Sequence, residues 1–214
     1  MHIPDGFLSP QTFLPLYAVA GAAWALGLRR VRRRLSEETI PLLAVVTALA
    51  FVLNMIALPL PGGTTVHATG IGLLAILFGP WTAFLCLSLV FLMQALLFGN
   101  GGVTALPLAA LAMGLAGSFT AVGLHRLLRA RSETAALFLA AAGGVLVAAG
   151  LVAVVLGIQP LIAQRADGTP LFFPFGLAIT LPAVLLPHLA VAAGEGVLTV
   201  LLYRFLTRLR GVTA

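Results

Sequence analysis

Apolar segments recur along the whole chain at close to the length that crosses a lipid bilayer. A spanning helix needs about 20 mostly apolar residues. Seven apolar segments stand out, at residues 12–28, 41–58, 68–78, 81–98, 106–128, 135–158 and 177–205. Because backbone polar groups inside a bilayer must bond to one another, these segments are predicted to be helices. The sequence therefore predicts an all-α integral membrane protein with about seven transmembrane helices.

The composition leaves no room for a separate soluble domain. Hydrophobic residues make up 61% of the 214 residues and charged residues only 8%, against about a quarter charged in soluble domains. We expect one membrane domain over residues 1–214. The third segment is short, since about 11 residues rise only about 16 Å, so we expect it to begin or end inside the protein. Gly79-Pro80 is predicted to separate it from the fourth segment.

Arginine sets the predicted orientation. All twelve basic residues are arginines and they cluster at segment ends. With the amino terminus outside, eleven of them fall on the cytoplasmic side and only Arg165 outside, as expected for short cytoplasmic loops. This orientation predicts a cytoplasmic carboxyl terminus, and we expect the chain in a bacterial or archaeal cell membrane. No basic stripe lies beside stacking aromatics, which argues against a nucleic-acid partner.

Small residues recur at four-residue spacing in several segments, a pattern that lets helices approach closely in lipid. The pairs and triplets are Ala44 and Ala48, Ala110 and Gly114, and Ala140, Gly144 and Ala148. Internal packing explains any one of them. The pair in the second segment is also a candidate interface with a partner subunit.

Met1 and His2 place a free α-amine, a backbone amide and an imidazole within two residues. An α-amine has a pKa of about 7.7–8.0, so a metal ion displaces its proton near neutral pH. A metal held at both ends can also displace the proton of the intervening amide, which gives fused chelate rings with three nitrogens in one plane. His67, on the same predicted face, is expected at the fourth corner. Planar nitrogen donors suit Ni(II) or Cu(II), and imidazole also accepts cobalt or zinc.

The alternative is an ordinary His2 in a frayed terminus and a His67 bonded to a loop carbonyl. The residues that follow favour an ordered terminus: Pro4 limits the backbone, Asp5-Gly6 indicates a tight turn, and Phe7-Leu8 is suited to docking on an apolar surface. Because no basic region precedes the first apolar segment, we expect no cleaved signal peptide.

Three motifs, Met1-His-Ile-Pro-Asp-Gly-Phe-Leu8, Gly62-Gly-Thr-Thr-Val-His67 and Phe78-Gly-Pro-Trp81, together with the 100–102 region Asn-Gly-Gly, resemble the CbiM/NikM family. Its members are the substrate-binding membrane subunits (S components) of cobalt and nickel energy-coupling-factor (ECF) transporters. The resemblance covers essentially the whole chain.

This resemblance implies a metal-binding loop at 1–11, an extra amino-terminal helix at 12–34 and a six-helix core at 41–206. It implies Met1, His2 and His67 as metal ligands, and Ala44 and Ala48 as candidates for the face toward a transmembrane coupling subunit. It also implies cytoplasmic ATPase subunits and often a small auxiliary membrane subunit. The chain has no phosphate-binding G-x-x-x-x-G-K-[ST] loop of its own.

Polar residues within apolar segments are costly and call for individual explanations. Asn54 and Gln94, with Asp5 in the terminal loop, are candidates to orient the metal ligands from outside the coordination sphere. His188 and Glu195 lie two helical turns apart on one face. They are candidates for a relay or a second metal position during release, with a buried polar network as the structural alternative.

The sequence thus predicts capture of a Co(II) or Ni(II) substrate at the outer face, with no organic cofactor and no reaction catalysed by this chain. The main alternative is an intramembrane metalloenzyme that uses His67, His188 and Glu195 around a metal-bound water. A third possibility is a membrane scaffold in which the histidines have no role.

Overall fold

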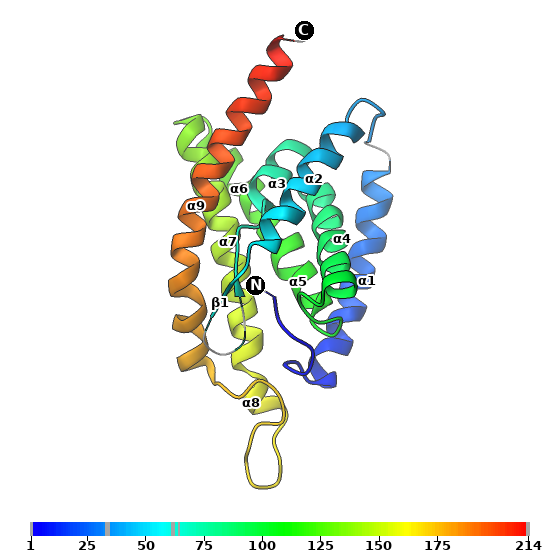
Figure 1. Cartoon of the computed structure of the whole chain (residues 1–214), viewed down its shortest axis with the longest axis vertical. Helices are drawn as coiled ribbons and strands as arrows, with labels where there is room; N and C mark the ends of the chain where they lie inside the picture. The colour runs from blue at the N-terminus through cyan, green and yellow to red at the C-terminus, as the bar shows by residue number, and fades with distance from the viewer. Residues whose placement is uncertain (1, 33–34, 61–62, 64, 213–214) are drawn as a thin grey trace.

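The structure is a computed structural model that describes residues 2–32, 35–60, 63 and 65–212. It is largely helical (Figure 1). The elements are α1 (Pro10–Val31), α2 (Ile40–Met55), β1 (Leu58–Pro59), β2 (Thr65–Val66), α3 (Ile71–Phe78), α4 (Pro80–Phe98), α5 (Leu106–Ala109), the π-helix η1 (Ala110–Gly117), α6 (Ser118–Leu128), α7 (Glu133–Gly157), α8 (Gln159–Ile162) and α9 (Leu177–Val212). Each predicted apolar segment is helical over most of its length, which confirms the mainly helical prediction.

Five helical stretches in the described part of the chain are long and apolar enough to cross a membrane. They are Pro10–Val31, Pro80–Phe98, Leu106–Leu128, Glu133–Ile162 and Leu177–Leu209. Helix α2 has 16 residues and α3 only 8. The chain is therefore a membrane protein, and the number of seven crossings stays a prediction.

Two helix limits differ from those expected. Helix α1 occupies Pro10–Val31 rather than 12–34, because proline at the first helical position is already suited to the helix; residues 33 and 34 lie outside the described part. Helix α9 runs beyond position 206 to Val212 (Figure 1). Its last turns are rich in leucine and arginine, which are good helix formers.

Helix α3 is short because a glycine limits it at each end. Gly70 and Gly79 have φ angles of 74° and 84°, a left-handed region that suits glycine and that no α-helix continues through. The helix therefore begins at Ile71 rather than at residue 68, and the predicted break at Gly79-Pro80 is confirmed. Its first five residues are buried, as expected for a segment inside the protein.

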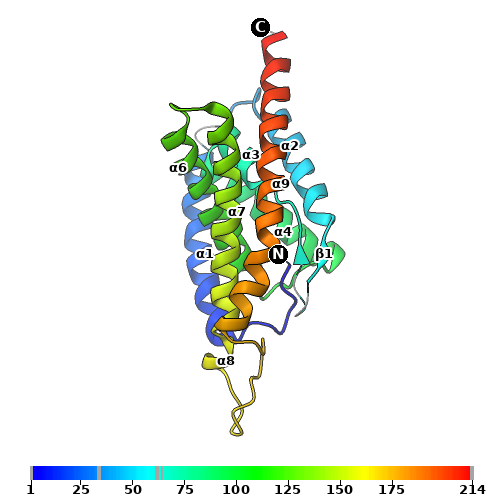
Figure 2. The same ribbon diagram turned by 90° about the vertical axis from the view of Figure 1, so that its left-hand side faces the viewer.

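The fifth predicted segment, residues 106–128, contains an unexpected π-helix, η1. Glycines bring this helix close to its neighbours: a Cβ on Gly114 would lie 3.1 Å from Phe84, and one on Gly117 would lie 3.0 Å from the carbonyl oxygen of Gly144. In α7 the triplet of Ala140, Gly144 and Ala148 is buried. These small residues therefore serve internal packing, with α7 and α9 side by side along the bundle (Figure 2).

The segment between α2 and α3 contains a short antiparallel hairpin that the sequence did not predict. Strand β1 pairs with β2 through Leu58 and Val66, and through Pro59 and Thr65. The predicted helix 41–58 therefore ends at Met55. The hairpin carries the chain to His67 at the side of the bundle where the amino terminus enters.

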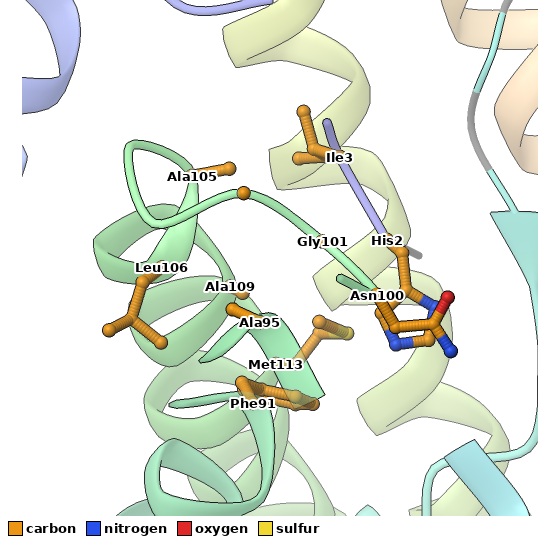
Figure 3. Close-up of a pocket in the computed structure, with 11 residues that line it drawn as sticks. His2, Ile3, Phe91, Ala95, Asn100, Gly101, Ala105, Leu106, Ala109 and Met113 are labelled. Atoms are coloured by element: carbon orange, nitrogen blue, oxygen red, sulfur yellow. The ribbon is translucent and has the colours of Figure 1, made fainter. Parts of the chain in front are cut away.

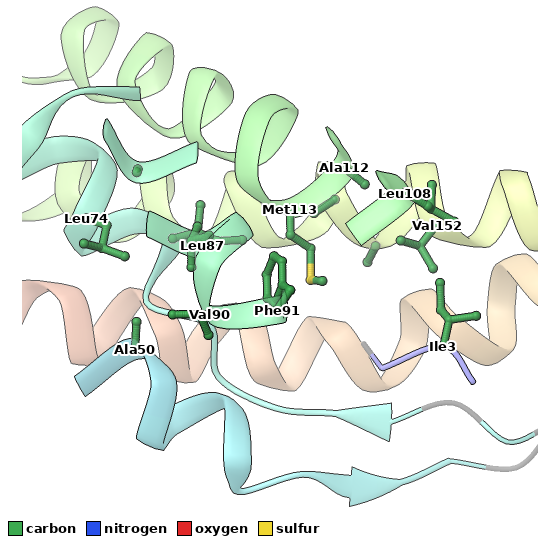
Figure 4. Packing of buried hydrophobic residues seen from close by; sticks show 14 of the residues in the cluster. Ile3, Ala50, Leu74, Leu87, Val90, Phe91, Leu108, Ala112, Met113 and Val152 are labelled. Carbon is green, nitrogen blue, oxygen red and sulfur yellow. The ribbon is translucent and has the colours of Figure 1, made fainter. Parts of the chain in front are cut away.

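Residues 2–9, which we name the amino-terminal strap, run from the start of α1 back into the bundle (Figure 1). The backbone N–H of Gly102 donates to the carbonyl oxygen of Ile3 at 2.7 Å, and that of Phe173 donates to Phe7 at 3.2 Å. Ile3 and Leu8 are buried, and Ile3 packs near Leu108 and Val152 (Figure 4). The prediction of an ordered terminus is confirmed for residues 2–8.

Candidate metal centre

The strap and the hairpin bring His2 and His67 together. Their ring centroids are 4.4 Å apart with an interplanar angle of 31°. The two residues are buried, with exposed fractions of 8% and 4%. Met1, the remaining predicted ligand, lies outside the described residues. The fold thus brings together two of the three residues that the sequence assigned to the metal.

Gln94 fixes which nitrogen of His2 carries the proton. Its Nε2 donates to the carbonyl oxygen of Phe51 at 3.3 Å, and its Oε1 lies 3.1 Å from Nε2 of His2. Because the amide oxygen can only accept, Nε2 of His2 is the donor. The lone pair of the imidazole is therefore on Nδ1, and Gln94 holds the ring in this orientation; its role beside a bound metal stays a prediction.

Thr65 contacts His2 at two atoms. The backbone N–H of His2 donates to the Thr65 hydroxyl at 3.0 Å, and Nδ1 of His2 lies 3.1 Å from the same oxygen. Since the lone pair is on Nδ1, the hydroxyl is the donor in the second bond. The amide nitrogen and Nδ1 of one residue therefore point at one position.

His67 is oriented by its own backbone. Its Nδ1 lies 3.0 Å from the carbonyl oxygen of Ala68, which can only accept, so Nδ1 carries the proton and Nε2 carries the lone pair. Burial, with the neighbouring imidazoles of His2 and His188, holds the pKa of His67 well below its ordinary value. Burial also lowers the pKa of His2 from 6.5 to about 4, against the opposing effect of its bond to Gln94. Both rings are neutral at pH 7, as metal ligation requires.

Asp5 anchors the strap to the loop between α4 and α5. Its carboxylate accepts bonds from the backbone of Val103 at 3.3 Å and of Thr104 at 2.8 Å, and from the Thr104 hydroxyl at 2.5 Å. Partial burial tends to raise the pKa of Asp5, but these hydrogen bonds outweigh it and the pKa is lowered. A Cβ on Gly102 would lie 2.4 Å from the Asp5 carboxylate, so only glycine fits there.

Asn54 and Glu195 hold Thr69, two residues after His67. The Asn54 side-chain amide donates to the carbonyl oxygens of Ala50 at 2.7 Å and of Thr69 at 3.1 Å. The Glu195 carboxylate accepts from the Thr69 amide at 2.7 Å and from its hydroxyl at 3.2 Å. Thr69 is thereby fixed to α2 and to α9.

Glu195 also caps a helix to which it does not belong. The residue before α3 is Gly70, which has no side chain to satisfy the first N–H groups of that helix. The Thr69 hydroxyl accepts from the Ile71 N–H at 3.2 Å, and the buried Glu195 carboxylate accepts in turn from that hydroxyl. Of the two explanations left open by the sequence, the contacts of Glu195 agree with the buried polar network.

His188 is buried in α9 with its Nδ1 donating to the carbonyl oxygen of Val184 at 2.7 Å. Its Nε2 has no hydrogen-bond partner among the described residues. Within that part of the chain no three His, Cys, Asp or Glu side chains converge on a possible metal position. Glu195 is engaged by Thr69 before α3, so its contacts do not support the alternative metalloenzyme site of His67, His188 and Glu195.

A cavity of about 20 Å³ lies beside His2, with Ile3, Phe91, Gly101 and Met113 in its wall (Figure 3). Such a volume has room for about one water molecule.

Sequence reasoning missed Thr65 and Thr69 as parts of the site. A signal for Thr65 was present, because residues two apart in an extended segment share a face, and Thr65 precedes His67 by two. No comparable signal marked Thr69, whose partners come from α2 and α9. Ala44 and Ala48, the candidate partner interface, are both exposed on α2.

The chain is similar along nearly its whole length to known metal transport proteins. The chain is 42% identical to the probable fused nickel transport protein LarMN of Lactiplantibacillus plantarum, over 97% of this chain and 65% of that protein. It is 40% identical to the fused nickel transport protein NikMN of Rhodobacter capsulatus, over 97% of this chain and 62% of that protein. The chain thus spans less than two thirds of either relative.

A solved structure described as a truncated transition metal transporter superposes with a TM-score of 0.94 at 37% identity, over 97% of this chain and 99% of that one. The family model for the cobalt uptake substrate-specific transmembrane region matches residues 2–212. The chain therefore belongs to the CbiM family of cobalt and nickel transport proteins.

Proposed function

We propose that this chain is the substrate-binding subunit of an ECF-type importer and captures Co(II) or Ni(II) at the outer face through nitrogens of Met1, His2 and His67. One observation carries the proposal. The His2 amide and Nδ1 point at a single position, and the His67 ring lies 4.4 Å from the His2 ring. Two nitrogen atoms of one residue that point at one position can bind a single metal ion as a chelate.

The protonation of the His2 and His67 rings is consistent with metal capture. Gln94 and the Ala68 carbonyl hold protons on His2 Nε2 and His67 Nδ1, which directs the lone pairs of the two rings to the other nitrogens. The α-amine and the His2 amide would release their protons to water as their nitrogens bind the metal. The chain breaks no other covalent bond in this process.

The same proposal assigns the rest of the transport cycle to other subunits. A transmembrane coupling subunit would face α2, where Ala44 and Ala48 are exposed. ATP hydrolysis would take place in cytoplasmic ATPases, and a small auxiliary membrane subunit would complete the assembly. The arginine distribution supports an outer amino terminus and a cytoplasmic carboxyl terminus in the cell membrane.

One alanine inserted ahead of Met1 tests the chelate directly. The insertion moves the α-amine away while it leaves every side chain in place. Affinity for Co(II) and Ni(II), measured by calorimetry on the purified chain in detergent, should fall at least as far as in His67→Ala, by about 100-fold or more. Substitution of the exposed Leu14 by alanine in α1 is a matched control that should leave affinity unchanged. Unchanged affinity after the insertion would overturn the assignment of the α-amine.

A further inference from the structure

The Thr65 hydroxyl forms hydrogen bonds with two atoms of His2 at once. It accepts from the His2 amide at 3.0 Å and donates to Nδ1 at a separation of 3.1 Å. A hydroxyl is well suited to this position because one oxygen can donate and accept together. Without this hydroxyl, the buried amide and Nδ1 of His2 would each lose a hydrogen-bond partner.

These two atoms of His2 are also the donors that the proposed function assigns to the metal. A hydrogen bond lies along the N–H direction of its donor and the lone-pair direction of its acceptor. A metal bound by the same two nitrogens would lie along the same directions, at about 2.0 Å from each. That position is too close to the Thr65 oxygen for both to remain in place.

We propose that the Thr65 hydroxyl occupies the chelating position in the metal-free protein, where it keeps the His2 amide and Nδ1 converged, and that the metal displaces it. The inference rests on the proposed function. Thr65 is thus a positioning residue of the empty state and no ligand of the loaded state. Rotation of its side chain to another staggered position is enough to withdraw the hydroxyl.

The variant Thr65→Val tests this role because valine keeps the branched shape and lacks the hydroxyl. Removal of the hydroxyl weakens only the empty state, so the purified chain should bind Co(II) and Ni(II) about tenfold more tightly, which corresponds to about 1.4 kcal/mol. Metal-free thermal stability should fall. Thr65→Ser, which keeps the hydroxyl, is the matched control and should bind as the wild type does.

A second readout does not depend on affinity. The visible spectrum of bound Ni(II) reports its ligands, and it should be the same in the wild type and in Thr65→Val. If the valine variant fails to fold, Thr65→Ala provides the same comparison. Weaker or unchanged affinity without the hydroxyl, or a shifted Ni(II) spectrum, would overturn the inference and leave the proposed function standing. If the wild type itself bound neither metal, the proposed function would fail and the inference with it.

Discussion

Two threonines lie two residues before and two residues after His67, and the protein holds them in opposite ways. Thr65 bonds to the amide and the imidazole of His2, which are candidate metal donors. Thr69 bonds to Asn54 of α2 and Glu195 of α9, which lie outside the proposed donor set. On the proposed function, the first set of bonds exchanges with a metal and the second set persists.

This difference separates binding from stability. Changes on the Thr69 side should loosen the fold and the metal site together. Changes around His2 should act on metal affinity with a smaller effect on the fold. The following predictions test that division, from the largest expected effect to the smallest.

Glu195→Leu should have the largest effect, because it leaves the Thr69 amide and hydroxyl without their buried acceptor. Two unsatisfied groups correspond to a loss of about 2–4 kcal/mol in the free energy of unfolding. Metal affinity should fall as well, because the position of His67 depends on the backbone of Thr69 two residues further along the chain. Thermal unfolding in detergent and calorimetry measure the two effects. The exposed Leu201→Ala on the same helix is the control, and a stable Glu195→Leu protein would contradict the role of Thr69 as an anchor.

Gln94→Leu should lower metal affinity by about 10- to 100-fold, the range typical for residues that orient a metal ligand. The His2 ring would lose the acceptor for its Nε2 proton. The exposed Leu97→Ala on the same helix is a suitable control. Equal affinities of Gln94→Leu and the wild type would show that ring orientation does not depend on this bond.

The stability of the metal-free protein should depend on the protonation of His2. Its pKa is about 4 when folded and 6.5 in its ordinary state, so protonation favours the unfolded chain. The contribution is fully present above about pH 6.5 and is lost as the pH falls toward about 4. The test is the difference in thermal stability between the wild type and His2→Gln over this range. That difference should shrink as the pH falls. A difference that grew as the pH fell would contradict the burial of a neutral His2.

Asp5→Asn should have the smallest effect, because the carboxylate is exposed and acts only on the loop at Val103 and Thr104. The amide retains one acceptor oxygen for these donors. We expect a change in metal affinity of a few-fold at most. Phe7→Ala, which removes an apolar contact of the strap, provides a comparison on the same segment. A loss as large as that of Gln94→Leu would place Asp5 closer to the metal than its contacts suggest.

The helical architecture was predictable, but the ends of the helices and their irregular parts were less so. Apolar length predicted the helices and Gly79-Pro80 predicted a break, since both are local properties. The hairpin β1–β2 and the π-helix η1 were missed. Two-residue strands carry no periodic signal, and a π-helix differs from an α-helix only in which backbone groups bond.

The candidate site was predictable in its chemistry and not in its arrangement. His2 was identified because it follows Met1 and adds an amide and an imidazole to the α-amine, and His67 because the predicted topology places it on the same face. Gln94 was identified because a polar group in an apolar helix is costly. The sequence did not decide whether Glu195 belongs to a relay or to a buried polar network, because its partner Thr69 is 126 residues away in sequence. Thr65 was overlooked although it lies two residues before His67, because its contact with His2 spans 63 residues.

The sequence by itself determined that the chain is a helical membrane protein and which side chains are candidate metal ligands. Both follow from residue type and local apolar length. Only the tertiary structure decided that the strap enters the bundle, that the His2 and His67 rings meet, and which nitrogen of each ring holds the proton. These outcomes depend on hydrogen bonds between distant segments, such as Gln94 with His2 across 92 residues, and local pattern does not encode such contacts.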